Sequence, residues 1–351
     1  MSATVLRAPA ADRAVGWWLA ACAAMVFAMV TIGGITRLSG SGLSIAEWAP
    51  LAGILPPLSH AEWERVFALY RDTPQYRDVN FGMTLAAFET IFWWEWLHRF
   101  WGRLLGLVFL LPLIGFALAG RIRRAEAGGF ALLFVLGGAQ GALGWYMVAS
   151  GLVDEPRVSQ YRLAAHLALA FALFVALLWA ALRRLVPPAE PVADERLDRV
   201  RRLLAAALAA TALTVLAGAF MAGTHAGLTY NTFPLMDGAL LPDGLYAAPW
   251  WRAPFESIET IQFNHRLLAI VTLGLVLATW WQSRWLALAP RARHVANAVA
   301  VAVVAQVALG IATLLLAVPL PLGVLHQAGA VVLLTLLVWL LHELRGPAQV
   351  A

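Results

Sequence analysis

The stretch EWLHRFWGRLLGL (Glu95–Leu107) places a glutamate, a histidine and two arginines at the start of a run apolar enough to cross a membrane. A related stretch, QFNHRLLAIVTLGL, recurs at residues 262–275. Ionisable residues inside a membrane helix are costly, and they usually mark a functional site. We therefore use these two stretches to predict both the arrangement of the helices and the position of a functional site.

The composition is that of a membrane protein. Of the 351 residues, 61% are hydrophobic and only 13% are charged, which is too apolar for an ordinary soluble domain. Apolar runs of about 20 residues, the length that crosses a bilayer, fall near 15–37, 96–120, 128–150, 161–186, 203–223, 263–284, 295–318 and 322–343. We expect an all-α polytopic membrane protein with eight transmembrane helices.

The distribution of charge predicts the orientation. The net charge of +5 is carried by arginine, because the chain has no lysine. The arginines cluster in three connections, at residues 121–124, 183–202 and 284–293. This is the positive-inside pattern and not a nucleic-acid-binding face. It predicts a multi-pass protein of the cell inner membrane with both termini cytoplasmic. The connections 38–94 and 224–261 then face outward, and residues 59–72 predict an amphipathic surface helix.

The two halves of the chain are related in sequence. Four pairs of strings match: GGITRLSGSGLS with GAFMAGTHAGLT, LHRFWGRLLGL with NHRLLAIVTLGL, GGAQGALGWYMV with VAQVALGIATLL, and AAHLALAFALFVALLWA with LHQAGAVVLLTLLVWLL. An even number of helices per repeat gives both copies the same orientation. We expect two pseudo-symmetric four-helix bundles, residues 1–190 and 191–351, joined by the Pro-rich stretch at 186–195.

Four histidines fall at one depth, in the first turns of the helices that enter from the outer side: His98, His166, His265 and His326. A lone histidine in a span is more often a hydrogen-bonded packing residue than a metal ligand. Two imidazoles facing each other in a four-helix core, however, are the usual way to hold a haem iron from both sides. Bare zinc is less favoured, because no further ligand recurs in both halves and Cys22 is the single cysteine. The pattern suggests one haem pocket per repeat.

Arginines near these histidines are candidates for binding the haem propionates, since the planar guanidinium can contact both oxygens of a carboxylate. The candidates are Arg37, Arg99, Arg103 and Arg266. The alternative is that each arginine only extends toward the interface or pairs locally, as Glu95 and Arg99 can at i,i+4. The sequence leaves both readings open.

The halves differ three residues before the first histidine of each repeat, where Glu95 precedes His98 and Gln262 precedes His265. A carboxylate beside a haem can shuttle protons or stabilise positive charge on a substrate, and glutamine does neither well. We therefore expect chemistry in the N-terminal pocket, with Glu95 as the catalytic residue, and a structural or electron-transfer haem in the C-terminal pocket. The alternative is that Glu95 only anchors Arg99.

The remaining histidines are expected to have no role in a pocket core. His225, at the outer end of the fifth span, has no counterpart in the first half, and we expect an interfacial residue or a neighbour of a propionate. His60, His294 and His342 fall in loops or at helix ends and are expected to be solvated.

The chain resembles the haem A synthase family over nearly its whole length. The likeness rests on GGITRLSGSGLSIAEWAP, EWLHRFWGRLLG, AGLTYNTFPLMDG, QFNHRLLA and LHQAGA. The resemblance implies oxidation of a ring methyl of haem O to a formyl group, giving haem A for cytochrome oxidase. Some family members have a cysteine pair in the first outer loop. This chain has none there, so it is similar to the proteobacterial and mitochondrial branch.

Carried over by position, the resemblance implies that His98 and His166 flank the substrate haem O and that Glu95 is the essential acidic residue. His265 and His326 would be the iron ligands of haem b. The implied partners are the lipid bilayer, haem O delivered by haem O synthase, and an electron donor that the sequence does not name. A homo-oligomer stays open, and no nucleic acid is expected.

Two other functions fit parts of the pattern. A bis-histidine membrane cytochrome b for electron transfer or quinol oxidation also needs paired histidines, but it does not need the Glu95/Gln262 difference. A transporter built on a parallel repeat predicts a site near the midplane, which the clustering of histidines toward the outer leaflet disfavours.

Overall fold

The computed structural model describes residues 10–47, 52–152, 158–187 and 194–345. In this part of the chain, eight helices are long and apolar enough to cross a membrane. They are α1 (Ala10–Leu38), α4 (Leu85–Leu118), α5 (Arg124–Gly151), α6 (Gln160–Leu185), α7 (Arg196–Thr224), α9 (Ile258–Ser283), α10 (Pro290–Leu315) and α11 (Leu320–Glu343). The other helices are short: α2 (His60–Arg71), α3 (Pro74–Asp78) and α8 (Ala253–Glu256). The expected all-α polytopic fold is confirmed.

The helices start earlier than hydropathy indicates. α4 begins at Leu85 instead of near 96, because the Thr84 hydroxyl caps it by accepting from the backbone N–H of Ala87 at 3.3 Å. Its first turns are then stabilised by packing, since Phe88 and Phe92 are buried in a cluster with Tyr70 of α2. The first turns of α7 are also polar, so hydropathy places the start of this helix too late. A window that averages hydropathy does not detect capped, half-polar turns of this kind.

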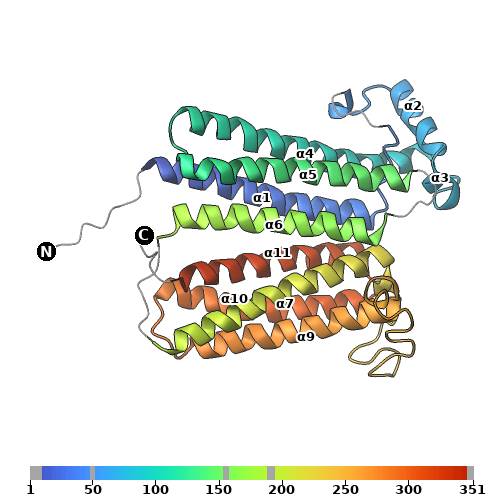
Figure 1. The fold of residues 1–351 in the computed structure, drawn as a ribbon. Helices are drawn as coiled ribbons and strands as arrows, with labels where there is room; N and C mark the ends of the chain where they lie inside the picture. Colours follow the sequence, from blue (N-terminus) through green and yellow to red (C-terminus); the bar gives the residue numbers. More distant parts are fainter. Residues whose placement is uncertain (1–9, 48–51, 153–157, 188–193, 346–351) are drawn as a thin grey trace.

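The long helices lie side by side, with α2, α3 and the connection after α7 at one end of the molecule and the start of α1 and the end of α11 toward the other (Figure 1). α1 packs against α4 and α6, α7 packs against α9, and α10 packs against α11. The two halves of the chain meet through α1, α6, α7 and α11. The boundary at residue 190 stays a prediction, and residues 188–193 of the Pro-rich stretch lie outside the described residues.

The connection between α1 and α4, called the first outer connection after the orientation predicted for it, folds over the end of α4. The helix expected at 59–72 is α2, and it begins with a capping box in which the Ser59 hydroxyl and the Glu62 carboxylate each accept a backbone N–H. Tyr70 is fully buried: it donates to Gln75, accepts from Asn80, and burial raises the pKa of its phenol. Gln75 in turn donates to the Gly40 carbonyl at 2.8 Å. These bonds tie α2 and α3 to the loop that follows α1.

His342 is not solvated, so that expectation is wrong. The last turn of α11 packs against the end of α6, which leaves His342 fully buried with its Nε2 3.1 Å from the Val186 carbonyl oxygen. Its ring also lies edge-on to Trp179. A position near a helix end suggested that His342 is exposed to solvent, but α6 extends as far as α11 does and covers it.

The neighbouring Glu343 carries the first stability prediction. Its buried carboxylate accepts from Arg291 Nε at 2.6 Å and from Trp339 Nε1 at 2.9 Å, joining α10 to α11. Glu343→Ala leaves both donors without this acceptor, so we expect a loss of about 2 kcal/mol in the free energy of unfolding in detergent. Glu47→Ala, which breaks an exposed ion pair with Arg65, is the control and should cost less than about 1 kcal/mol. Equal losses would contradict the prediction.

Candidate functional site

The four histidines come from alternate long helices: His98 from α4, His166 from α6, His265 from α9 and His326 from α11. In the C-terminal half, the ring centroids of His265 and His326 are 6.4 Å apart, with the ring planes at 81°. In the N-terminal half, the ring of His98 lies against Gly33 of α1 and that of His166 lies against Gly144 of α5. The structure therefore brings His265 and His326 together as the repeat predicts, and the pairing of His98 with His166 stays a prediction.

The spacing of the C-terminal pair fits one iron between two imidazoles. Two metal–nitrogen bonds of about 2 Å each, together with half the width of each ring, put the centroids roughly 6 Å apart. No group of three or more His, Cys, Asp or Glu side chains gathers at a metal-binding distance within the described ranges. The donor set is thus two imidazoles per pocket, which suits a haem, whose ring nitrogens supply the remaining ligands.

The pairs differ in what holds the second ring nitrogen. His265 Nδ1 lies 3.2 Å from the Thr214 carbonyl oxygen, and His326 Nδ1 lies 3.2 Å from Gln306 Nε2. In the N-terminal pair, the Nδ1 atoms of His98 and His166 are buried and have no hydrogen-bond partner among the described residues. A carbonyl that accepts from Nδ1–H, as that of Thr214 does for His265, leaves Nε2 free to bind a metal and fixes the orientation of the ring. The Gln306 amide nitrogen carries only N–H donors, so it contacts the His326 ring without being an acceptor for Nδ1–H.

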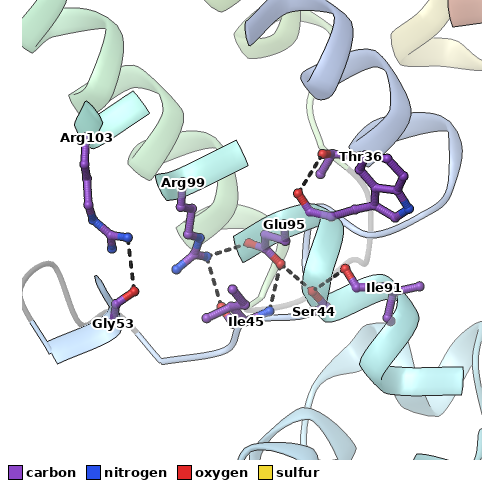
Figure 2. A network of polar contacts seen from close by, with 9 residues as sticks. Thr36, Ser44, Ile45, Gly53, Ile91, Glu95, Arg99 and Arg103 are labelled. Atoms are coloured by element: carbon purple, nitrogen blue, oxygen red, sulfur yellow. Dashed lines mark hydrogen bonds and ion pairs between the residues drawn. The ribbon is translucent and has the colours of Figure 1, made fainter. Parts of the chain in front are cut away.

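Glu95 lies beneath the first outer loop and is only 2% exposed. Figure 2 shows its carboxylate between α4 and that loop. Oε2 accepts from the Ser44 hydroxyl at 2.7 Å and from the Ile45 backbone N–H at 2.8 Å, while Oε1 accepts from Arg99 Nη2 at 2.6 Å. Arg99 Nη2 also donates to the Ile45 carbonyl at 3.1 Å. Glu95 anchors Arg99, as the simpler alternative proposed, and it also anchors the loop.

Gln262 makes the corresponding contacts in the second half. Its Nε2 donates to the carbonyls of Ala226, at 2.8 Å, and Thr229, and its Oε1 accepts from Arg266 Nη2 at 2.8 Å. Arg266 Nη2 also donates to the Tyr230 carbonyl at 2.7 Å. In the aligned repeat, Thr229 and Tyr230 stand where Ser44 and Ile45 stand. Both halves therefore use this position to hold an outer loop, but with opposite hydrogen-bond polarity.

The arginines divide into two groups. Arg99, Arg103 and Arg266 donate to backbone carbonyls of the outer connections, with Arg103 reaching Gly53 at 3.1 Å (Figure 2). Arg37 is half-buried in the last turn of α1 and has no hydrogen-bond or ion-pair partner within the described ranges. It lies at i,i+4 from Gly33, which faces His98, and so on the pocket side of α1. Of the four candidates, Arg37 best fits an anion-binding role.

Sequence reasoning missed several residues around the site. Ser44 and Ile45 hold Glu95, while Gln140 and Gln306 donate to the backbone carbonyls of His166 and His326 at 3.1 and 2.8 Å. The aligned repeat contained the signal for both glutamines, because each lies four residues before a glycine in its helix. Only the distances show what the glutamines do.

Three other histidines lie outside the two histidine pairs. His60 is exposed and pairs with Glu64 at 3.3 Å, and His294 is exposed on α10. Both confirm the expected solvation. His225 is exposed and ends α7 in a left-handed conformation, with φ 56°. This position at the end of the fifth span is as expected, while the outer side of the membrane and a contact with a propionate stay predictions.

Comparison with known proteins gives the chain its family. A family model described as cytochrome oxidase assembly protein matches residues 16–338. A haem A synthase of Parvibaculum lavamentivorans is 51% identical over 332 residues, which is 94% of each chain. Haem A synthases of Rhodospirillum centenum and Nitrosospira multiformis are 51% and 47% identical, covering 97% and 96% of this chain and 91% and 95% of their own. The chain belongs to the cytochrome oxidase assembly protein family, together with these haem A synthases.

Proposed function

We propose that this chain is a haem A synthase, an oxidoreductase that converts one ring methyl of haem O to a formyl group. The conversion passes through hydroxylated intermediates and removes four electrons from one carbon. With water as the oxygen source, the methyl group and one water molecule give the formyl group, four protons and four electrons, which an electron acceptor must take up; with dioxygen as the source, dioxygen is itself the oxidant. The observation that carries the proposal is the pair of like histidine sites whose surroundings differ at Glu95 and Gln262. The similar proteins named above support it.

The residues present fit two haems in different roles. We propose that His265 and His326 hold haem b, which supplies one-electron redox chemistry when bound. The Thr214 carbonyl, which accepts from Nδ1 of His265, leaves Nε2 of that ring free to bind iron and suits a resident group. His98 and His166 would flank haem O, and their Nδ1 atoms, which lack a partner among the described residues, suit a substrate that must enter and leave.

We propose that Glu95 acts through its charge and its hold on the loop. The Ser44 hydroxyl, the Ile45 N–H and Arg99 all donate to it, and a carboxylate, which only accepts, matches three donors. Preorganised charge close to a reacting centre stabilises charge of the opposite sign that develops there. Of the two roles considered for Glu95, electrostatic stabilisation fits this bonding better than carrying a proton.

Arg37 is our candidate for binding a propionate of haem O. Its counterpart in the second half is Ala222, so this cation belongs to the substrate side alone. We expect Arg37→Gln to weaken the binding of haem O by about tenfold, since a charge-assisted hydrogen bond contributes about 1.5–3 kcal/mol. A haem O titration followed by absorbance measures the change, with exposed Arg65→Gln as the control. Unchanged affinity would remove Arg37 from the pocket.

The arrangement of the ends supports the proposed orientation. The start of α1 and the end of α11 lie toward one end of the helix array, and the long connections lie at the other (Figure 1). With the arginine-rich connections on the cytoplasmic side, the histidine pairs lie toward the outer leaflet of the cell inner membrane. Haem O from haem O synthase and an electron donor would be partners, and a homo-oligomer stays open.

The test of the proposed function is chemical. Cells that make this protein together with a source of haem O should contain haem A, identified by extracting the haems and separating them by chromatography. Cells with the haem O source alone are the control. Haem O that stays unconverted while the purified protein carries low-spin haem b would instead favour an electron-transfer cytochrome.

A further inference from the structure

Each of the four pocket histidines lies against a glycine of a neighbouring helix. A methyl group built on the glycine would come within 2.9 Å of His98 at Gly33, 3.1 Å of His166 at Gly144, 3.2 Å of His265 at Gly218 and 2.7 Å of His326 at Gly310. The nearest atom in every case is Cε1 of the imidazole. Ordinary contact begins near 3.4 Å, so none of the four positions has room for a side chain.

Not every glycine in these helices lies close to a neighbouring side chain. Gly106, Gly115, Gly141 and Gly274 lie within long helices, and a methyl group on them would meet nothing within 4 Å. Glycines in membrane helices often serve only to let two backbones approach. At Gly33, Gly144 and Gly310, however, the three nearest atoms all belong to a histidine ring. The space at these glycines is therefore filled by imidazole and not by a helix backbone.

The same contacts orient the rings. From the methyl position on Gly310, the distances are 2.7 Å to Cε1, 3.3 Å to Nδ1 and 3.5 Å to Nε2 of His326. The order is the same for Gly33 and Gly144, so Nε2 is the farther of the two ring nitrogens from the glycine in each case. In α5 and α10, the residue one turn before the glycine is the glutamine that binds the histidine carbonyl. Glutamine fixes the backbone of the histidine, and glycine receives its ring.

We infer that Gly33, Gly144, Gly218 and Gly310 are positioning residues that set the place of the four imidazoles. This rests on the proposed haem ligation. A methyl group on Gly310 would displace the His326 ring by about 0.7 Å to reach 3.4 Å, and one on Gly33 would displace His98 by about 0.5 Å. Gly144 and Gly218 require about 0.3 and 0.2 Å. Metal–ligand distances tolerate about 0.2 Å, so the effect is graded and largest at Gly310.

The C-terminal pocket gives the direct test. Gly310→Ala should lose most of the low-spin haem b signal in absorbance and electron paramagnetic resonance spectra of the purified protein. Gly218→Ala should lose less, and Gly274→Ala should match the wild type. Wild-type spectra and haem content in Gly310→Ala would overturn the inference. A wild-type protein without low-spin haem would instead contradict the proposed function, so failure of the inference and failure of the proposed function give different results.

The N-terminal pocket gives a matched pair on one helix. Gly144→Ala should weaken the binding of added haem O by several-fold, whereas Gly141→Ala, one turn away on α5, should leave it unchanged. Both variants should keep the C-terminal haem signal, which reports that the protein is folded. Equal affinities for haem O in the two variants would contradict the inference for this pocket.

A double variant distinguishes a clash with the His326 ring from a general folding defect. In the His326→Ala background the ring is absent, so adding Gly310→Ala should no longer lower the Tm of the protein in detergent. Adding it to the wild type should lower the Tm or prevent accumulation in the membrane. The same loss in both backgrounds would show that the methyl group clashes with something other than the imidazole, and it would overturn the inference.

Discussion

Purified His326→Ala protein is expected to lose the low-spin haem b spectrum almost completely, by more than about tenfold in signal per protein. His265 and His326 would hold the haem iron, and two imidazole ligands would give it a low-spin state. The centroids of His265 and His326 are 6.4 Å apart, so removing one ring leaves the other without an opposing ligand. His265→Ala should have the same effect, because the iron needs both. Reduced-minus-oxidised difference spectra measure the change.

His294→Ala is the control for this prediction, since His294 is exposed on α10 and away from both pockets. It should keep the spectrum, the haem content and the Tm of the wild type. Added imidazole should restore part of the low-spin signal in His326→Ala by occupying the empty space. A full low-spin signal in His326→Ala without added imidazole would show that His326 does not bind the iron.

Hydropathy and the repeat predicted most of the fold, because a bilayer requires long apolar helices and leaves few alternatives. They did not predict where α4 begins, since Thr84 caps turns whose average hydropathy is low. They also misjudged His342, whose burial depends on the end of another helix. Such features arise from contacts between distant segments, and a local sequence pattern does not contain them.

The repeat named the candidate site residues but not their hydrogen bonds. The repeat identified the histidines and the Glu95/Gln262 difference, because both are visible when the halves are aligned. It did not reveal that Glu95 binds the Ser44–Ile45 segment, which is about 50 residues away in the sequence. It also treated Arg37 and Arg99 alike, although only Arg99 has hydrogen-bond partners among the described residues.

Glu95→Gln is expected to reduce haem A formation by at least about a hundredfold while leaving the C-terminal haem b in place. Two losses combine. The buried negative charge disappears, and removing a preorganised electrostatic group of this kind costs about 10²–10³ in rate. In addition, glutamine offers one acceptor and one donor group where three donors converge, so either the Ile45 N–H or Arg99 faces another donor. Haem A yield and haem b content, measured on the same preparation, check both parts.

The second half supplies the matched control. Gln262→Glu places a carboxylate oxygen against the carbonyls of Ala226 and Thr229, which are acceptors, so it disturbs the loop contact without touching the substrate side. If Glu95 only held a loop, the two exchanges would reduce haem A formation to a similar degree.

Ser44→Ala gives a second comparison, because it removes one donor to Glu95 but keeps the charge. We expect Ser44→Ala to retain much of the activity that Glu95→Gln loses. Comparable losses in these two variants would assign Glu95 to the loop alone, and normal haem A formation by Glu95→Gln would exclude it from both roles.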